Sequence, residues 1–506
     1  MSAAPDPLGG FRQLLQTATQ DPSERPLLFT DGLLGPRLGA LLRRCAVPHE
    51  FDRDLLMAIS GSDEASTDAV YGQFSELSVI QFTGSALSVH ERWRKPLWAW
   101  WLAEPQRGEF TQLSALLAGW FEARASSATP EINLRRRMFH LIGANHDQGM
   151  ALFDRLYFQA RHGRRFSECS LLIRLVREYD PLLGDGDRAL LAYQEGKLAS
   201  DLLEWEPALV HFRAVREGVA SDALRISALI REGHVLRALG RNDAALALLE
   251  QARKQIAASP ATAHLSWRAL QELGEVYRDI GQGDRARATL TAARDAAAGD
   301  GADMAGILNS LGTVQLRLLD TPAAVLSFRR SLALLERGGD VVRPGGVLNN
   351  LGLAQVEQCD WAGAEASFSA SLACKRAASD QSGQGTALLN LSRVQVAQDK
   401  VDAACTSARE AARLFEAAGD GRGLARALLA RARLASRAKQ AAEAVDLARQ
   451  AVDRATLVGD LGLAATAREE LARLPRAGPW PVMLKLVAIG LLVALVIAII
   501  AIIDKF

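Results

Sequence analysis

A pair of small residues recurs at a fixed spacing about every forty residues along this chain, and it constrains the fold more than any other feature. In seven successive places a glycine, or a small substitute, is followed twelve residues later by an alanine. A small residue in each of two antiparallel helices lets their backbones approach closely, so each place predicts a helical hairpin. The seven pairs are Gly196 with Ala208, Gly233 with Ala245, Gly274 with Ala286, Gly312 with Ala324, Gly352 with Ala364, Ser392 with Ala404 and Ala432 with Ala444.

The positions four and seven residues after each alanine are mostly apolar, which predicts one buried face on the second helix of each hairpin. The complete pattern, as in Leu311-Gly312 with Ala324, Phe328 and Ser331, resembles the tetratricopeptide repeat (TPR). The resemblance covers residues 185–474, with about seven repeats and a capping helix. It implies a mainly α fold, a helical-hairpin solenoid wound as a right-handed superhelix, whose concave wall is built from the first helices.

Some repeats depart from this pattern. Ser392 and Ala432 replace the glycine, and the leucine before the glycine is replaced by Glu195, Glu232 and Arg431 in three repeats. Terminal repeats of such arrays are expected to be irregular.

The resemblance also implies a binding surface, because proteins of this kind usually bind extended peptides or partner helices on the concave wall. Asparagine can clamp a peptide backbone and arginine can bind carboxylates in a bidentate manner, so we hypothesise a protein or peptide ligand of acidic character. The alternative, a merely solvated face, stays open. The predicted binding residues are Arg237, Arg278, Asn309, Arg317, Asn349, Asn350, Asn390 and Arg393.

Residues 35–103 carry a different pattern. Helices are expected at 38–45, 52–59 and 67–77, followed by two short alternating strands at 78–83 and 86–89 that a Gly84-Ser85 turn connects. This order predicts a small winged-helix-like α+β unit. Together with the repeats behind it, the unit resembles the downstream half of STAND ATPases. The ATPase itself is missing, because no Gly-x-x-x-x-Gly-Lys-Ser/Thr loop occurs in the sequence.

Winged helices often bind DNA, yet the third predicted helix has no lysine or arginine and carries two acids, Asp68 and Glu76. These acids would face phosphates, so we do not expect nucleic-acid binding. A membrane-tethered transcriptional regulator that binds DNA through this unit is nevertheless the alternative function. A salt-dependent gel shift separates it from a scaffold.

Residues 104–184 are expected to form a helical connector with a degenerate hairpin. Five of the nine tryptophans lie between Trp93 and Phe121, and we expect them to pack the winged-helix-like unit onto this connector. Trp100 and Trp101 are adjacent and cannot share one side of a helix. A partly exposed interaction hot spot at this pair is the alternative.

Near the C-terminus, residues 486–503 contain no charge, and residues 482–503 predict one transmembrane helix of about 30 Å. A short proline-containing linker at 475–481 precedes it. Residues 1–34 show no pattern of a signal peptide, and Arg473 and Arg476 flank the span. We therefore expect a tail-anchored, single-pass protein of the cell membrane whose soluble part lies in the cytoplasm.

The five cysteines are scattered, and neither metal-ligand spacing nor a catalytic motif is present. We expect no metal, no cofactor and no enzymatic activity. The net charge of +1 provides no bulk field toward nucleic acid. The leading hypothesis is a membrane-anchored TPR scaffold or adaptor for protein–protein or peptide binding, acting in regulatory or defence signalling.

Overall fold

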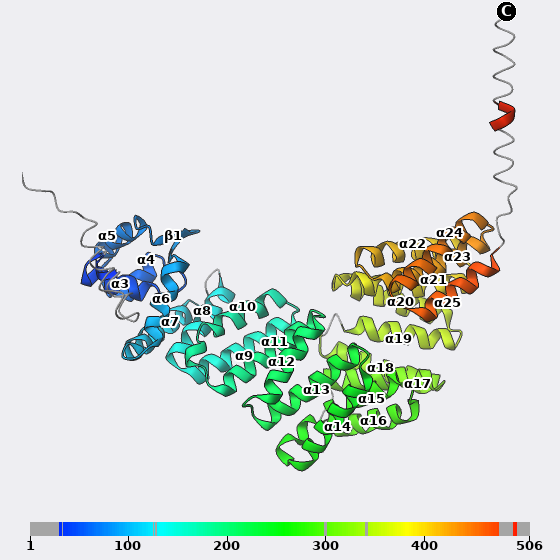
Figure 1. The fold of residues 1–506 in the computed structure, drawn as a ribbon, viewed down its shortest axis with the longest axis horizontal. Helices are drawn as coiled ribbons and strands as arrows, with labels where there is room; N and C mark the ends of the chain where they lie inside the picture. Colours follow the sequence, from blue (N-terminus) through cyan, green and yellow to red (C-terminus); the bar gives the residue numbers. More distant parts are fainter. Residues whose placement is uncertain are drawn as a thin grey trace, which may run out of the picture. The chain divides into compact units, whose positions relative to one another are not determined.

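The computed structural model of the chain describes residues 30–32, 34–124, 126, 129–297, 301–339, 343–474 and 489–492. The chain divides into two compact units, Met1–Leu239 and Gly240–Phe506. Within the described residues the regular structure is almost entirely helical (Figure 1). The division falls between α13 (Asp222–Ala238) and α14 (Asn242–Ala258), inside the predicted repeat array.

Residues 36–89 of the first unit form three helices and a β-hairpin, in the order expected for residues 35–103. Asp52 and Asp63 cap the second and third helices by accepting hydrogen bonds from backbone N–H groups of the first turn. In the hairpin Ile80 lies opposite Val89, and Phe51 forms an additional bridge to Leu87. The elements are α3 (Pro36–Cys45), α4 (Arg53–Ser60), α5 (Glu64–Ser75), β1 (Ile80–Thr83) and β2 (Ala86–Val89).

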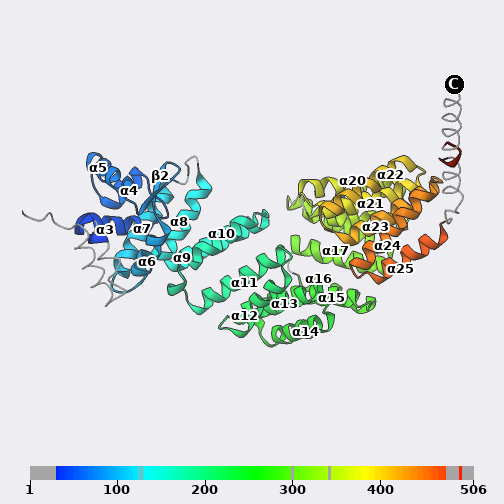
Figure 2. The same ribbon diagram turned by 45° about the horizontal axis from the view of Figure 1, so that its top comes forward.

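The rest of the first unit is a succession of helices in which chain neighbours pack as antiparallel pairs (Figure 2). The helices are α6 (Glu91–Leu102), α7 (Arg107–Ala123), α8 (Pro130–Ala144), α9 (His146–His162), α10 (Phe166–Arg177), α11 (Asp185–Asp201), α12 (Trp205–Glu217) and α13. The degenerate hairpin expected before the repeats is the pair α9 and α10.

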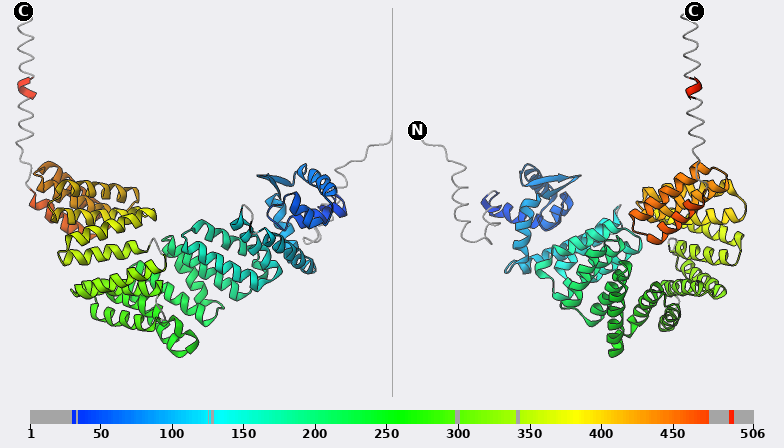
Figure 3. Two further views of the ribbon diagram at one scale, coloured as in Figure 1. Left: turned by 180° about the vertical axis from the view of Figure 1, so that it is seen from behind. Right: turned by 45° about the vertical axis from the view of Figure 1, so that its right-hand side comes forward.

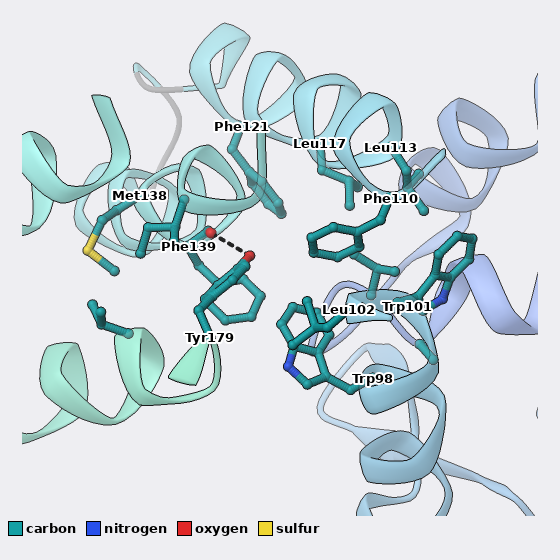
Figure 4. Close-up of a cluster of buried hydrophobic side chains, with 14 of the residues drawn as sticks. Trp98, Trp101, Leu102, Phe110, Leu113, Leu117, Phe121, Met138, Phe139 and Tyr179 are labelled. Carbon is teal, nitrogen blue, oxygen red and sulfur yellow. Dashed lines mark hydrogen bonds between the residues drawn. The ribbon is translucent and has the colours of Figure 1, made fainter. Parts of the chain in front are cut away.

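An aromatic cluster joins α6 to the helices that follow it (Figure 4). Trp98 stacks on Phe139 of α8 with ring centres 5.3 Å apart, and it meets the Tyr179 ring edge-on. The Tyr179 hydroxyl donates a 2.7 Å hydrogen bond to the carbonyl oxygen of Phe139. Trp101 is buried whereas Trp100 is partly exposed. The expected packing role of the tryptophans is therefore confirmed, and the adjacent pair faces two sides.

The second unit consists of helical hairpins stacked in chain order (Figure 3). Its α-helices are α14, α15 (Ser266–Asp279), α16 (Gly283–Ala296), α17 (Ala302–Arg317), α18 (Thr321–Arg337), α19 (Pro344–Glu357), α20 (Trp361–Ala377), α21 (Gln381–Ala397), α22 (Val401–Ala417), α23 (Gly421–Arg437), α24 (Ala441–Leu457) and α25 (Leu461–Arg473). The last of these is the expected capping helix.

The repeated small residues mark the closest approach within each hairpin. A Cβ atom added to Gly312 would lie 2.7 Å from the Phe328 ring, so no larger residue fits without a shift. Where Ser392 replaces the glycine, the partner position holds Ala408 in place of a phenylalanine or leucine. Both residues are buried. Volume lost on one helix is thus gained on the other, which explains how the later repeats tolerate the substitution.

In the first unit, ion pairs hold the two glutamates that replace the leucine of the repeat pattern. Glu195 receives Arg177 of α10 through two nitrogens at 3.1 and 2.9 Å. Glu232 receives Arg213 of α12 at 3.0 Å and lies 3.2 Å from Arg216. In both cases the arginine comes from the second helix of the preceding hairpin, so a charged contact between neighbouring repeats takes the place of an apolar one.

Three successive hairpins of the second unit share a buried or half-buried hydrogen bond between their two helices. Ser327, Ser367 and Ser407 each donate to the side-chain oxygen of a glutamine twelve residues earlier, at 2.8, 2.6 and 2.9 Å. The acceptors are Gln315, Gln355 and Gln395. Each bond satisfies two polar groups that the closely packed helices would otherwise bury unpaired.

The predicted terminal segments lie largely outside the described residues. Of the predicted transmembrane helix at 482–503 the structure describes 489–492, and the linker at 475–481 is not described. Of residues 1–34, only 30–32 and 34 are described. Within the described part of the chain, no helix has the length and apolar character needed to cross a membrane.

Candidate functional site

A groove of about 740 Å³ lies along α21 and α23, which are the first helices of the last two hairpins. Both helices begin at an aspartate that caps the first turn: Asp380 accepts from Gly383 N, and Asp420 accepts from Gly423 N, each at 2.8 Å. Asp420 also accepts a hydrogen bond from Ser382 at 2.5 Å. This second bond ties the start of α23 to α21 and fixes the two walls of the groove.

The ring of Phe415, which comes from α22, forms part of the groove lining between these two helices. Only 2% of this residue is exposed. A Cβ atom on Gly423 would lie 2.2 Å from the ring, and one on Gly385 would lie 2.9 Å from it. Glycine at both positions therefore makes room for the ring. Leu389, Val396, Leu429 and Leu434 add further apolar surface to the lining.

The charged residues of the lining are nearly all basic. Five arginines and one aspartate line the groove: Arg393, Arg422, Arg426, Arg433, Arg437 and Asp420. The aspartate is already occupied by its capping bond and by Ser382. Arginine is permanently charged and presents several donors in a fixed plane, so this lining attracts carboxylates and other anions.

Three of the five arginines have an acidic partner. Arg422 pairs with Asp460 at 3.0 Å, Arg433 with Glu470 at 2.9 Å, and Arg437 with Asp399 at 3.1 Å. Arg393 and Arg426 are exposed and make no hydrogen bond or ion pair with any described residue. A ligand can engage these two guanidinium groups without displacing an existing ion pair.

Two of the predicted binding residues, Asn390 and Arg393, line this groove. The asparagines also form a repeated contact between neighbouring first helices. Asn350 donates to Asn309 at 3.0 Å, and Asn390 donates to Asn349 at 2.8 Å. Each side-chain amide therefore uses one donor or one acceptor in the bond to its neighbour, and its other donors and acceptors stay available for further hydrogen bonds.

The other predicted arginines have local partners. Arg317 donates to the carbonyl oxygen of Arg278 at 2.9 Å, and Arg278 pairs with Glu275 at 2.7 Å and with Asp279 at 2.8 Å. These contacts lie on α15 and α17. Arg237 belongs to α13 of the first unit, whereas the other seven predicted residues belong to the second unit.

The sequence reasoning missed four arginines of α23: Arg422, Arg426, Arg433 and Arg437. Their spacing contains the signal that would have found them. Intervals of four, seven and four residues place all four side chains on one face of a helix. The Gly/Ala pattern concerns small residues only and does not include charged positions, and the last repeat has Ala432 in place of the glycine.

The helix expected to enter a DNA groove presents a different surface. Within α5 there is no lysine or arginine, and Asp68 of this helix pairs with Arg53 of α4 at 3.2 Å. The Arg53 guanidinium also lies 5.2 Å from the centre of the Tyr71 ring. The Arg53 side chain is thus already engaged by residues of α5.

No protein-family model matches this chain, and no curated protein matches it either. Among solved structures, the chain is similar to a Signal Transduction ATPase with Numerous Domains (STAND) protein with a tetratricopeptide repeat sensor from Pyrococcus horikoshii, with a TM-score of 0.50 and 14% identity. That match covers 88% of this chain and 61% of that one. A Rap protein complexed with Competence and Sporulation Factor aligns with a TM-score of 0.46 and 13% identity, covering 64% of this chain and 97% of that one. At 14% identity the likeness to the STAND protein concerns the fold alone, and it agrees with the hairpin geometry: the repeats have the TPR-type helical fold.

Proposed function

We propose that this chain is a non-enzymatic scaffold that binds an acidic, partly apolar segment of a partner protein in the groove along α21 and α23. The observation that carries this proposal is the lining itself, with five arginines, one occupied aspartate and an apolar floor around Phe415. Opposite charge draws the ligand in, and burial of its apolar side chains against the floor adds affinity.

The arrangement favours a peptide over a small anion. Arg393 lies on α21 and Arg426 on α23, so both walls of the groove carry a guanidinium group without a partner among the described residues. A volume of about 740 Å³ accommodates several side chains. An extended or helical segment with carboxylates on one side can reach both walls at once.

The proposal also includes a membrane anchor and a place in regulatory or defence signalling. The anchor rests on the uncharged run at 486–503, with the soluble part in the cytoplasm. The signalling role rests on the order of the parts, a three-helix and hairpin module followed by TPR-type repeats. We do not propose DNA binding, because α5 offers no basic side chain to a phosphate backbone.

The binding proposal is tested with the full chain in detergent and a short fluorescein-labelled peptide of alternating glutamate and leucine. Fluorescence anisotropy should show saturable binding that weakens as salt is added. The same peptide with glutamine in place of glutamate should bind at least about tenfold more weakly, because it lacks the charge-assisted hydrogen bonds.

Matched charge reversals locate the site. Arg393→Glu and Arg426→Glu should each weaken binding by about tenfold or more. Arg449→Glu makes the same charge change at an exposed position of α24 outside the groove lining, and it should leave the affinity nearly unchanged. Equal loss in all three variants would show that the peptide responds only to net charge, and the groove proposal would then be abandoned.

A further inference from the structure

Two arginines of the groove lining also hold the capping helix α25. Arg433 donates from its Nε atom to a carboxylate oxygen of Glu470 on α25 at 2.9 Å. The Nε atom of Arg422 lies 3.0 Å from a carboxylate oxygen of Asp460, the residue just before α25. The same face of α23 therefore lines the groove and is tied to α25 near both of its ends.

The start of α25 depends on Asp460. The second carboxylate oxygen of this residue accepts a hydrogen bond from Leu463 N at 3.0 Å and caps the first turn. The turn that precedes it packs closely on the start of α23, since a Cβ atom on Gly421 would lie 2.6 Å from Val458. A change at Arg422 thus acts directly on the residue from which α25 begins.

The apolar packing of α25 is small. Its buried side chains are Ala464 and Ala467, and Leu463 and Leu471 are only half buried. In contrast, α23 buries several leucines. An alanine methyl group removes much less apolar surface from water than a leucine side chain, so it contributes less to holding a helix in place. The two ion pairs therefore supply a substantial part of what fixes α25 on α23.

A ligand in the groove reaches the same two arginines. The side chains of Arg422 and Arg433 are 60% and 53% exposed, whereas those of Asp460 and Glu470 are 21% and 15% exposed. A ligand carboxylate that binds either guanidinium group shares it with an acid at α25. Two anions beside one cation repel each other, so the attraction between that arginine and α25 decreases.

We propose that an acidic ligand in the groove loosens α25 from α23, and that groove occupancy is thereby coupled to the C-terminal end of the repeat array. This inference rests on the proposed function, because it needs an acidic segment bound along α23. From Arg426, which has no partner among the described residues, Arg422 is one helical turn away and Arg433 is two turns away on the same face. A segment anchored at Arg426 can therefore reach both.

Coupling of this kind is reciprocal. If the ligand weakens the hold of α23 on Asp460 and Glu470, then removing the charge of either acid strengthens ligand binding. The loss of one half-exposed ion pair changes an equilibrium by up to about fivefold. The chain leads from α25 to the predicted linker at 475–481, so a loosened α25 carries the state of the groove toward that segment.

The affinity test uses the full chain and the fluorescein-labelled peptide of alternating glutamate and leucine. Glu470→Gln and Asp460→Asn should each tighten binding by about twofold to fivefold. Asparagine also caps helices, so the second variant keeps the first turn of α25. The matched control is Glu469→Gln, the same change at an exposed neighbour that pairs with Arg473 of its own helix at 3.9 Å. The control should leave the affinity nearly unchanged.

Hydrogen exchange of the wild-type chain, followed by mass spectrometry, tests the loosening itself. Saturating peptide should speed exchange of the α25 amides by about twofold to fivefold and leave those of α20 unchanged. A bound ligand ordinarily slows exchange because it stabilises the folded state, so the direction of the change is diagnostic.

The outcomes separate the two proposals. Peptide binding without faster exchange of α25 would overturn the coupling and leave the groove proposal standing. The same holds if Glu470→Gln binds the peptide no more tightly than Glu469→Gln does. If the peptide does not bind the wild-type chain at all, both proposals fail.

Discussion

The Nε atom of Arg213 lies 3.0 Å from a carboxylate oxygen of Glu232, and the glutamate is almost completely buried whereas the arginine is half exposed. Later repeats have a leucine at the position of Glu232. The pair is therefore asymmetric: water can solvate the arginine if the contact is lost, but it cannot reach the carboxylate. This asymmetry leads to a prediction about which partner matters more for stability.

Replacing Glu232 with leucine should change the free energy of unfolding by less than about 1 kcal/mol, because a leucine fits the position in other repeats and the arginines return to water. Replacing both Arg213 and Arg216 with alanine should cost about 3 kcal/mol, because an uncompensated carboxylate stays buried. Urea denaturation of the full chain, followed by circular dichroism, measures both. A larger loss for Glu232→Leu than for the double variant would contradict this interpretation.

Two glycines of α19 should respond oppositely to alanine. At Gly352 a Cβ atom would lie 2.7 Å from the Phe368 ring, so Gly352→Ala should destabilise the protein by about 1–3 kcal/mol. At Gly346 an added Cβ atom meets nothing within 4 Å, and Gly346→Ala should stabilise the helix by up to about 1 kcal/mol. Thermal unfolding midpoints should therefore move in opposite directions. A similar shift for both would show that close packing is not what requires Gly352.

The turn between α17 and α18 holds Leu319 with a φ of 62° and 83% of its surface exposed. The leucine side chain buries little apolar surface there, and its backbone is strained in the left-handed region. Leu319→Gly should therefore raise the free energy of unfolding by about 0.5–1 kcal/mol. Gly281 has a φ of 81° in the turn between α15 and α16. Gly281→Ala should lower stability by about 1 kcal/mol. The urea denaturation midpoint of Leu319→Gly should lie above that of the wild type, and the midpoint of Gly281→Ala should lie below it.

Glu178, the residue that follows α10, pairs with His49 and with Arg94 of α6. Acid should weaken this contact before the repeats unfold. Burial alone would raise the pKa of Glu178, but its hydrogen bond to His49 and the charge of Arg94 bring it below its usual value. A carboxyl group with a lowered pKa contributes stability above the pKa that it has in the unfolded chain, near 4.3, and loses it as the pH falls through the folded value.

In the Glu178→Gln variant this contribution is absent at every pH. The melting temperature of the variant should therefore fall less steeply than that of the wild type when the pH drops from about 5 to about 3. The two melting temperatures should converge at the acidic end. Parallel curves over this range would show that Glu178 does not contribute to the acid sensitivity.

The hairpins could be predicted from the sequence because they depend on local volume. Gly312 and Ala324 must be small whatever surrounds the repeat, so their spacing alone indicates two closely packed helices. The compensating pair of Ser392 and Ala408 was not foreseen, because its meaning depends on which side chain of the second helix faces the first.

The candidate site was predicted only in part, since its charges are decided by partners far apart in the sequence. Two of the residues predicted to bind a partner, Asn390 and Arg393, line the groove. The spacing of the four arginines of α23 predicts that they share one helix face. The acidic partners of Arg422 and Arg433, however, lie on or next to α25. Sequence spacing does not reveal such pairing, and it is the pairing that distinguishes Arg426 as an arginine left for a ligand.

Two kinds of polar contact in the second unit affect how the array can change in length. The bond from Ser367 to Gln355 closes within its own hairpin, so a whole forty-residue unit can be duplicated or deleted without leaving such a bond open. The bond from Asn350 to Asn309 instead crosses to the neighbouring hairpin. A unit inserted there must bring an asparagine at both positions, and this requirement selects which repeats can become neighbours when such a gene expands.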